Sequence, residues 1–108
     1  MEKNKSPYGK LLVDLIKSKN MSQVEFYQLL GIKKPYFYDI ISGISNPPPP
    51  ELQLKIIKIL QLSKNEANKL LDEASLIRNE LPADIYIYLR NNKKKYSEIR
   101  KDIDLSLL

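Results

Sequence analysis

The chain has 108 residues, of which 43% are apolar and 29% charged, and it contains neither cysteine nor histidine. This length and composition suit one globular domain with a single modest core. The two missing residue types exclude disulfides, metal sites built from thiolates or imidazoles, and catalysis by cysteine or histidine.

The net charge is +5, and the basic excess lies at the two ends of the chain. Residues 1–44 contain seven basic and four acidic residues, residues 45–82 five of each, and residues 83–108 six basic and four acidic. This sign suits a polyanionic partner, although solubility alone also accounts for a charge of this size. The first apolar run is short and is interrupted by Asp14, so we expect a soluble intracellular protein without a signal peptide or membrane span.

Two helices are predicted before the first glycine turn. Residues 8–19 carry apolar side chains at helical spacing and predict an amphipathic helix. The run from Ser22 to Glu25 matches a capping box, in which the serine hydroxyl accepts from a backbone N–H and the glutamate reaches back. It predicts a second helix through Leu30, with Gly31 as its C-terminal stop.

A third short helix is predicted after that glycine. Pro35 fits its first turn, where a missing N–H has no consequence, and Gly43 closes it. Its inner stripe is predicted to consist of Phe37, Ile40 and Ile41.

The run SNPPPP, residues 45–50, cannot be helical and predicts an extended connector. It is either a stiff spacer between two helices, which we favour, or a ligand for an SH3-type domain. Residues 51–61 return to a helical pattern. In that pattern Leu52, Ile56, Ile59 and Leu60 face one way, and Lys55 and Lys58 face the other.

A second capping box, from Ser63 to Glu66, predicts the start of a longer helix. That helix is expected to bury one stripe, made of Ala67, Leu70, Leu71, Ala74 and Ile77. The segment LPADIYIYLR alternates like a strand, but Pro82 and Asp84 form a good helix start and no second strand is evident, so we predict a helix. The tail, residues 91–108, has helical spacing with few apolar residues and predicts either a marginal helix or a frayed end.

Two short helices joined by a glycine turn, the first with a capping box, form the supersecondary unit of a helix-turn-helix. Ile32, directly after the glycine, is the apolar residue that such a turn needs between its helices. The stretch MSQVEFYQLLGIKKPYFYDIISGISNPPPPELQLKIIKILQLS resembles the phage-repressor-like, Cro-like helix-turn-helix domain of the XRE family of bacterial transcription regulators. The resemblance covers about residues 8–63.

The resemblance implies that the third helix lies in the DNA major groove. By that analogy, base contacts come from Lys34, Pro35 and Asp39, and backbone or mixed contacts from Lys33, Tyr36 and Tyr38. Gln23, at the start of the preceding helix, matches the family's phosphate-binding glutamine.

Several of these side chains have a second interpretation. Tyr36 and Tyr38 either face DNA, which we favour, or pack on the proline connector. Asp39 either reads a base or repels phosphate and pairs with Lys33. Lys93 to Lys95 are more often a solvated helix end than a phosphate clamp.

Two positions depart from the family pattern. Tyr27 stands where the family usually has alanine at the helix crossing, so we expect a wider crossing or a ring displaced toward solvent. Ile41 and Ser42 replace a common charged pair, which is expected to make this surface more apolar.

We therefore expect an all-α fold: a compact five-helix Cro/repressor-like helix-turn-helix domain with one or two additional C-terminal helices. Residues 1–63 form the expected DNA-binding domain, and residues 64–108 a helical extension for dimerisation packed on the same core. The expected partners are double-stranded DNA and a second copy of the chain, with no membrane and no cofactor, in the cytoplasm of a bacterium or as a phage-encoded protein.

The leading hypothesis is a sequence-specific transcriptional regulator, a repressor, which reads two half-sites as a homodimer through residues 35–42. The alternative is a helix-turn-helix-fold protein that binds a regulatory protein partner, as an anti-repressor, antitoxin or anti-nuclease factor of a mobile element. An enzyme is not expected, because no catalytic carboxylate pair, metal cluster or phosphate-cradling glycine loop is evident.

Overall fold

A computed structural model describes residues 5–108, and within that range the chain is helical with no strand. The expected all-α class is therefore confirmed for the described residues, and the start of the expected first domain, residues 1–4, lies outside them. The helices are α1 (Pro7–Ser18), α2 (Gln23–Leu30), α3 (Lys34–Ser42), α4 (Pro50–Leu60), α5 (Lys64–Arg78), α6 (Ala83–Asn91) and α7 (Lys95–Arg100), followed by a 3-10 turn, η2 (Leu105–Leu107).

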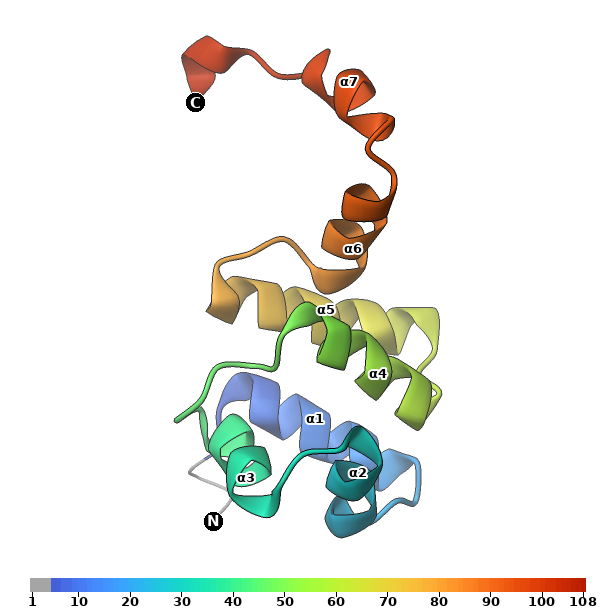
Figure 1. Cartoon of the computed structure of the whole chain (residues 1–108). Helices are drawn as coiled ribbons and strands as arrows, with labels where there is room; N and C mark the ends of the chain where they lie inside the picture. The colour runs from blue at the N-terminus through green and yellow to red at the C-terminus, as the bar shows by residue number, and fades with distance from the viewer. Residues whose placement is uncertain (1–4) are drawn as a thin grey trace.

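The helices are stacked along one long axis, and the molecule measures 47 × 25 × 23 Å. Helices α1, α2 and α3 lie at one end, α4 and α5 cover them, and α6 carries the chain away toward the other end (Figure 1). Helix α1 packs against both α3 and α5, while α2 packs against α4. The main core contains large side chains from the first five helices, including Tyr8, Leu12, Ile16, Phe26, Leu30, Phe37, Ile40, Ile56, Leu60 and Leu70.

The capping residues predicted from the sequence lie at the ends of helices in the structure. The Ser22 hydroxyl accepts the backbone N–H of Glu25 at 3.0 Å, whereas the reciprocal bond of a full capping box is absent from the bonds of the described chain. The box from Ser63 to Glu66 is complete, and both of its hydrogen bonds are present. Gly31 ends α2 with φ +82°. At such a positive φ a side chain would be strained, so glycine is the natural stop.

The backbones of α1 and the end of α3 approach each other closely. A Cβ on Gly9 would lie 2.6 Å from the carbonyl carbon of Ile41 and closer still to its oxygen. That oxygen accepts the backbone N–H of Ser6 at 2.9 Å and the Ser6 hydroxyl at 3.2 Å. Because Gly43 ends α3 in a left-handed conformation, the Ile41 carbonyl has no later helical N–H to accept and is satisfied by α1 instead. No pattern in the sequence indicates this contact of Gly9.

The prediction for one side chain of the α5 stripe is wrong. The predicted residues Ala67, Leu70, Leu71 and Ala74 are buried, but Ile77 is exposed. The inward position of the last turn belongs instead to Arg78, whose guanidinium donates to the carbonyl oxygen of Pro47 at 2.8 Å. A polar bond to the connector therefore replaces the expected apolar contact.

The C-terminal region is helical but increasingly uncovered. Helix α6 packs against α4 and α5 and buries only Ala83, which joins Ala67 and Leu71 in a second small cluster. The helix predicted for LPADIYIYLR is thus confirmed. Helix α7 forms the only α-helix of residues 92–108, and none of its side chains is buried. None of the helices within residues 5–108 has both the length and the apolar character that a membrane-crossing segment needs.

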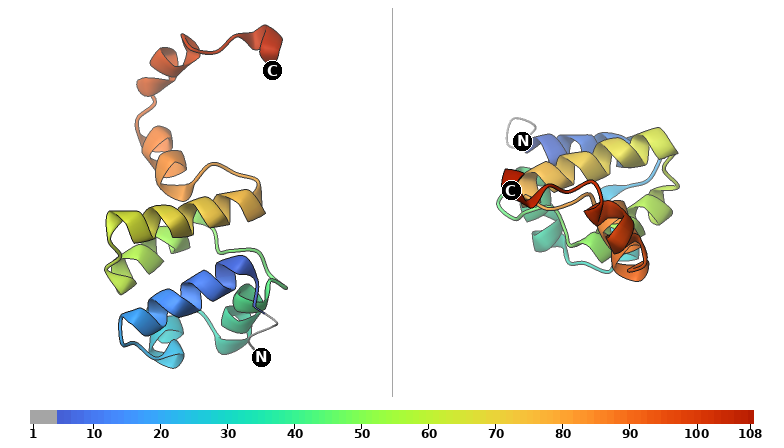
Figure 2. Two further views of the ribbon diagram at one scale, coloured as in Figure 1. Left: turned by 180° about the vertical axis from the view of Figure 1, so that it is seen from behind. Right: turned by 90° about the horizontal axis from the view of Figure 1, so that it is seen from above.

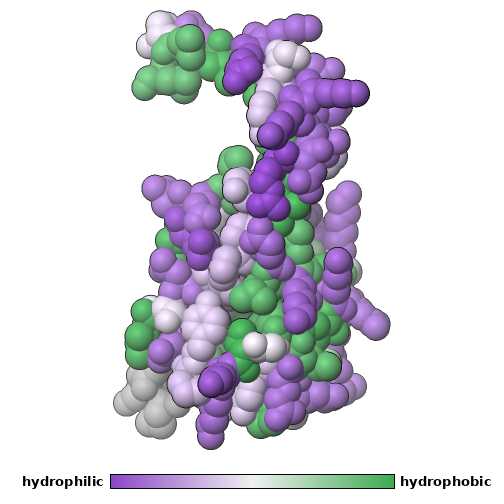
Figure 3. All heavy atoms as spheres, viewed as in Figure 1, coloured by the Kyte–Doolittle hydropathy of each residue, from purple (hydrophilic) through white to green (hydrophobic). Residues whose placement is uncertain are grey.

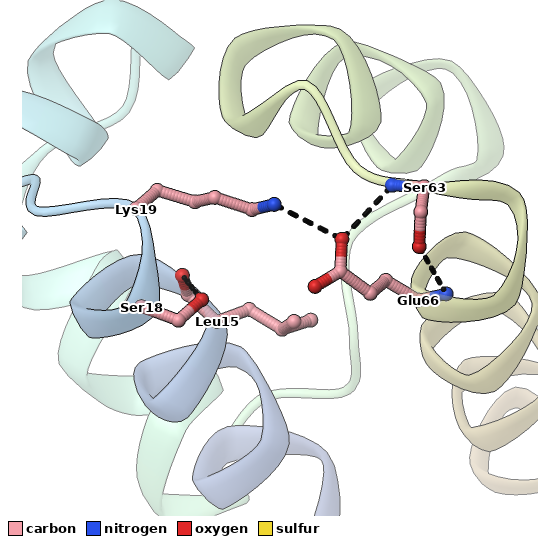
Figure 4. A network of polar contacts seen from close by, with 5 residues as sticks. All are labelled: Leu15, Ser18, Lys19, Ser63 and Glu66. Atoms are coloured by element: carbon pink, nitrogen blue, oxygen red, sulfur yellow. Dashed lines mark hydrogen bonds and ion pairs between the residues drawn. The ribbon is translucent and has the colours of Figure 1, made fainter.

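The α5 cap also connects α5 to α1. Figure 4 shows one oxygen of Glu66 between the Ser63 backbone N–H, at 2.9 Å, and the Lys19 ammonium, at 3.0 Å. The Ser63 N–H, and after it Lys19, hold the pKa of the Glu66 carboxyl below its ordinary value. A carboxyl with a lowered folded-state pKa stabilises the fold above its unfolded pKa of about 4.3 and loses this effect as the pH falls through the folded value.

The Gly9 contact predicts a large effect of one methyl group. Gly9→Ala should lower the free energy of unfolding by about 3 kcal/mol, because backbone on both sides cannot yield as a side chain can. Urea unfolding followed by circular dichroism measures the change. Lys10→Ala, at the exposed next position of α1, is the matched control and should change stability by less than about 0.5 kcal/mol. Equal stabilities of the two variants would contradict the close crossing.

The Glu66 network predicts a pH-dependent difference. Glu66→Gln should be less stable than the wild type at neutral pH, and the difference should shrink as the pH falls below about 4.3, where the wild-type carboxyl also becomes neutral. Urea midpoints measured across acid and neutral pH test this. Glu73→Gln, on the same helix but without a hydrogen bond or ion pair in the described chain, should not show the convergence.

Candidate nucleic-acid interface

The surface of interest is built on α2, the turn after it and α3. Ile32 is partly buried and packs against the main core, as expected for the residue after Gly31. The backbone N–H of Ile32 donates to the Tyr27 carbonyl at 3.1 Å, which closes the turn. Lys33 is extended, with φ −90° and ψ 155°, and the next residue begins α3. The turn therefore joins α2 to α3 at the end of the molecule opposite α7 (Figures 1 and 2).

Phe37 fixes the rotation of α3 about its own axis. Its side chain is fully buried, and its ring centre lies 5.8 Å from Phe26, 5.5 Å from Tyr27 and 5.3 Å from Tyr38. Ring pairs at these separations attract one another in addition to the area that they bury. Tyr27 is partly buried against Phe37, so its ring is not displaced to solvent; an aromatic contact fills the crossing. Ile41 is also buried and adds nothing apolar to this surface, which corrects the expectation for that position.

The predicted contact residues fall into two groups. Lys33, Lys34 and Pro35 are exposed in the first turn of α3, and Tyr38 is 43% exposed on the following turn. Tyr36, Asp39 and Gln23 are half-buried.

Tyr36 is the least outward of the predicted residues. Its ring packs against the main core beside Tyr8 on α1. Burial, and secondly the nearby Tyr36, raise the pKa of the Tyr8 phenol. The Tyr8 hydroxyl is buried without a hydrogen-bond partner in the described chain. Tyr36 is therefore partly covered by the core, and only part of its side chain is exposed.

Gln23 and Tyr38 are brought together although they are 15 positions apart. The Tyr38 hydroxyl donates to the Gln23 side-chain oxygen at 3.3 Å. This bond leaves the Gln23 amide hydrogens, which are donors, available to an acceptor outside the protein. It also ties the exposed face of α3 to the first turn of α2, where unpaired backbone N–H groups favour an anion.

The backbone carbonyl of Asp39 is hydrogen-bonded, whereas its side-chain carboxylate forms no ion pair in the described chain. Its carbonyl oxygen accepts the N–H groups of Gly43 and Ser45, both at the end of α3. Its carboxylate makes no ion pair with Lys33 or with any other residue among 5–108. The pairing of Asp39 with Lys33 is therefore absent, and the carboxylate keeps its acceptors for other groups.

Three supporting contacts are not indicated by the sequence pattern. The exposed Lys55 of α4 donates its ammonium to the Leu30 carbonyl at 3.1 Å, at the negative C-terminal end of α2. Gln53 is buried and donates to the Pro48 carbonyl at 2.8 Å, on the connector that Arg78 also holds. Apolar periodicity gives no signal for such bonds, because each joins a polar side chain to a distant backbone carbonyl.

The proline connector is part of the fold. Pro47 and Pro48 are buried, and both of their carbonyls accept hydrogen bonds from side chains. These contacts support the interpretation of the connector as a spacer. Lys93, Lys94 and Lys95 are exposed near α7, far from α3 along the long axis (Figure 1).

Residues 5–108 contain no group of three or more His, Cys, Asp or Glu side chains placed to hold a metal ion. A shallow groove of about 420 Å³ lies beside the start of α2. Its lining consists of Val13, Ile16, Lys17, Asn20, Met21, Ser22 and Gln23.

No protein-family model, curated protein or solved structure matches this chain. The function must therefore be inferred from the residues and their geometry.

The Lys55 contact predicts a modest contribution to the stability of the turn. Lys55→Ala should lower the free energy of unfolding by about 1 kcal/mol, because it removes a charged donor from the end of α2. The loss should decrease at high salt, which screens the charge. Lys58→Ala, one turn later on α4 and exposed without such a bond, is the control. Indistinguishable urea midpoints for the two variants would contradict the assigned role.

Proposed function

We propose that the protein is a sequence-specific double-stranded DNA-binding protein that reads the major groove with α3 and acts as a transcriptional regulator, a repressor. The observation that carries the proposal is the arrangement of α2 and α3. Phe37 turns one side of α3 into the core, and the same rotation exposes Lys33, Lys34 and Pro35 at the beginning of the helix.

The dimensions support this proposal. An α-helix with its side chains is about 10–12 Å across, so α3, with nine residues, fits a major groove about 12 Å wide. In a helix-turn-helix the N-terminal residues of the second helix contact base edges. The exposed first turn of α3 is the part that meets this requirement. We assign α1–α5 to a five-helix Cro/repressor-like domain, with α6 and α7 as additional helices.

Each exposed group has a matching chemistry on DNA. The Lys34 ammonium can donate to guanine O6 and N7, and the Asp39 carboxylate can accept from cytosine N4. Pro35 offers apolar contact to a thymine methyl group. Gln23, with its oxygen held by Tyr38, directs its amide donors to a phosphate, which fixes position without reading sequence.

One such surface covers only a few base pairs, so affinity and specificity require two copies on half-sites about one helical turn apart. A homodimer on a two-half-site operator is therefore part of the proposal. The location of such a protein is the cytoplasm, on the DNA that it regulates.

A second function has one observation in its favour. Val24 and Leu29 on α2 and Ile44 after α3 are exposed apolar residues, and Ile44 is 79% exposed. Apolar side chains beside a recognition surface suit a protein partner better than phosphate. The second candidate is thus a helix-turn-helix-fold module that binds a regulatory protein.

The proposal predicts different effects for two variants of the same surface. Lys34→Ala should weaken binding by about 1–3 kcal/mol and relax the preference at one base pair, whereas Gln23→Ala should weaken binding to all sequences alike. Selection from random duplex DNA at physiological salt, followed by titration of the selected site, measures both. Lys69→Ala removes the same charge from exposed α5 and is the control.

Salt dependence separates the two candidate functions. DNA affinity that falls steeply with salt reflects counterion release from phosphates and supports the first. A Lys34→Ala variant with unchanged affinity and unchanged sequence preference would refute the groove assignment. A chain that selects no consensus and binds DNA without salt dependence would favour the protein-binding module.

A further inference from the structure

The last 17 residues, which we call the C-terminal arm (residues 92–108), stand away from the rest of the molecule. None of them is buried. Every hydrogen bond and ion pair of residues 95–108 joins residues within four positions of each other. Figure 1 shows the arm rising from α6 and bending over the body, and Figure 3 shows open space between its tip and the body.

The arm has the composition of a segment that packs against something. Its exposed apolar side chains are Ile99, Ile103, Leu105, Leu107 and Leu108. Leu107 is 81% exposed and Leu108 is 90% exposed, and apolar side chains gather at this tip in Figure 3. Helix α7 has six residues, and helices of that length are unstable in water unless a packed face supports them. No residue among 5–108 supplies that face.

Further exposed apolar side chains occur along the chain from the end of α5 into α6. We call Leu76, Ile77, Leu81, Ile85 and Tyr88 the α5–α6 patch. Leu76, in the last turn of α5, is 77% exposed. A shallow groove of about 380 Å³ continues the patch along α6, where its lining is mainly apolar: Asp84, Ile85, Tyr88 and Leu89.

The charges of the two surfaces are complementary. Residues 72–84, around the patch, contain four acidic residues and one basic residue, a net charge of −3. Residues 93–108 of the arm contain five basic and three acidic residues, a net charge of +2. An arm docked on a patch would therefore bring opposite charges together around an apolar centre, the usual arrangement of a protein interface.

We propose that two copies of this chain exchange their C-terminal arms, so that each arm covers the α5–α6 patch of the other copy. A two-fold pair forms this contact twice, which gives a closed interface with no unsatisfied surface left for a third copy. Covering about 60 Å² on each of the twenty apolar side chains removes roughly 1,200 Å² from water. Stable interfaces begin at about 1,200 Å².

The exchange is compatible with two DNA half-sites, and in this respect it rests on the proposed function. The arm lies at one end of the long axis and α3 at the other, with α5 and α6 between them (Figures 1 and 2). A two-fold axis along that direction places both α3 helices at the same end, side by side. Each copy is 25 and 23 Å wide across this axis. The distance between the two α3 helices of such a pair is therefore comparable to the spacing of about 34 Å between half-sites.

The first test is the mass of the full-length protein in solution without DNA, measured by sedimentation equilibrium over a concentration series. The wild type should be a dimer. Ile99→Ser with Ile103→Ser on the arm, and Leu76→Ser with Leu81→Ser on the patch, should each raise the dimer dissociation constant at least about tenfold. Leu29→Ser with Ile44→Ser, equally exposed but at the α3 end, is the matched control and should leave it unchanged.

A second measurement does not depend on loss of assembly. The chain contains no cysteine, so single cysteines report one contact each. A ¹⁵N-labelled Leu107→Cys chain mixed with an unlabelled Leu81→Cys chain should form a disulfide between one copy of each on mild oxidation, identified by mass. Leu29→Cys in place of Leu81→Cys should not form this mixed disulfide.

The possible results separate this inference from DNA binding. A monomeric wild type, or a dimer that both serine double variants leave intact, would overturn the exchange whatever the DNA result. The exchange would also be overturned if the two single-cysteine chains formed no mixed disulfide while a chain carrying both Leu107→Cys and Leu81→Cys closed a disulfide within itself, because the arm would then cover its own patch. A dimer lost in both double variants, in a chain that binds no DNA, would uphold the exchange and refute the proposed function.

Discussion

The contact between Gly9 and the Ile41 carbonyl is the constraint on which the arrangement of this protein depends. Helix α1 packs against α3 on one side and α5 on the other, so the depth of the α1–α3 crossing sets the position of the exposed face of α3 relative to the whole body. Ser6 secures the same point with two hydrogen bonds to that carbonyl. Glycine has no side chain, so the two backbones can come into contact at this crossing. The Ile41 carbonyl oxygen, which has no partner within its own helix, accepts hydrogen bonds from the residue that caps α1.

Sequence alone predicted the parts of the structure that depend on near neighbours. Ser22, Gly31 and Gly43 mark helix ends through hydrogen bonds or dihedral angles within five positions, and such signals can be read locally. The contacts of Gly9 and Lys55 join residues more than twenty positions apart, and no periodic pattern announces them. The same limit explains the error at Ile77, where a long-range bond of Arg78 occupies the inward position.

At the candidate interface, periodicity separated Phe37 from its aromatic neighbours but could not place those neighbours in detail. Tyr36 and Tyr38 are two positions apart on α3, about 200° around the helix, so they cannot share one environment. The structure puts Tyr36 beside Tyr8 and Tyr38 beside Gln23. One tyrosine is thus largely a packing residue and the other orients a polar side chain. The difference arises from α1 and α2, both of which contact α3.

The two ends of the molecule have different physical characters, and this difference bears on regulation. The α3 end is supported by a continuous core, whereas the C-terminal arm has no packing of its own. If the arms exchange as proposed, assembly depends on the concentration of the chain. If α3 also binds DNA as proposed, joining two α3 surfaces in one dimer raises the affinity for paired half-sites through effective concentration, without a new contact to DNA. Under both proposals, the concentration of the chain itself determines whether the operator is occupied.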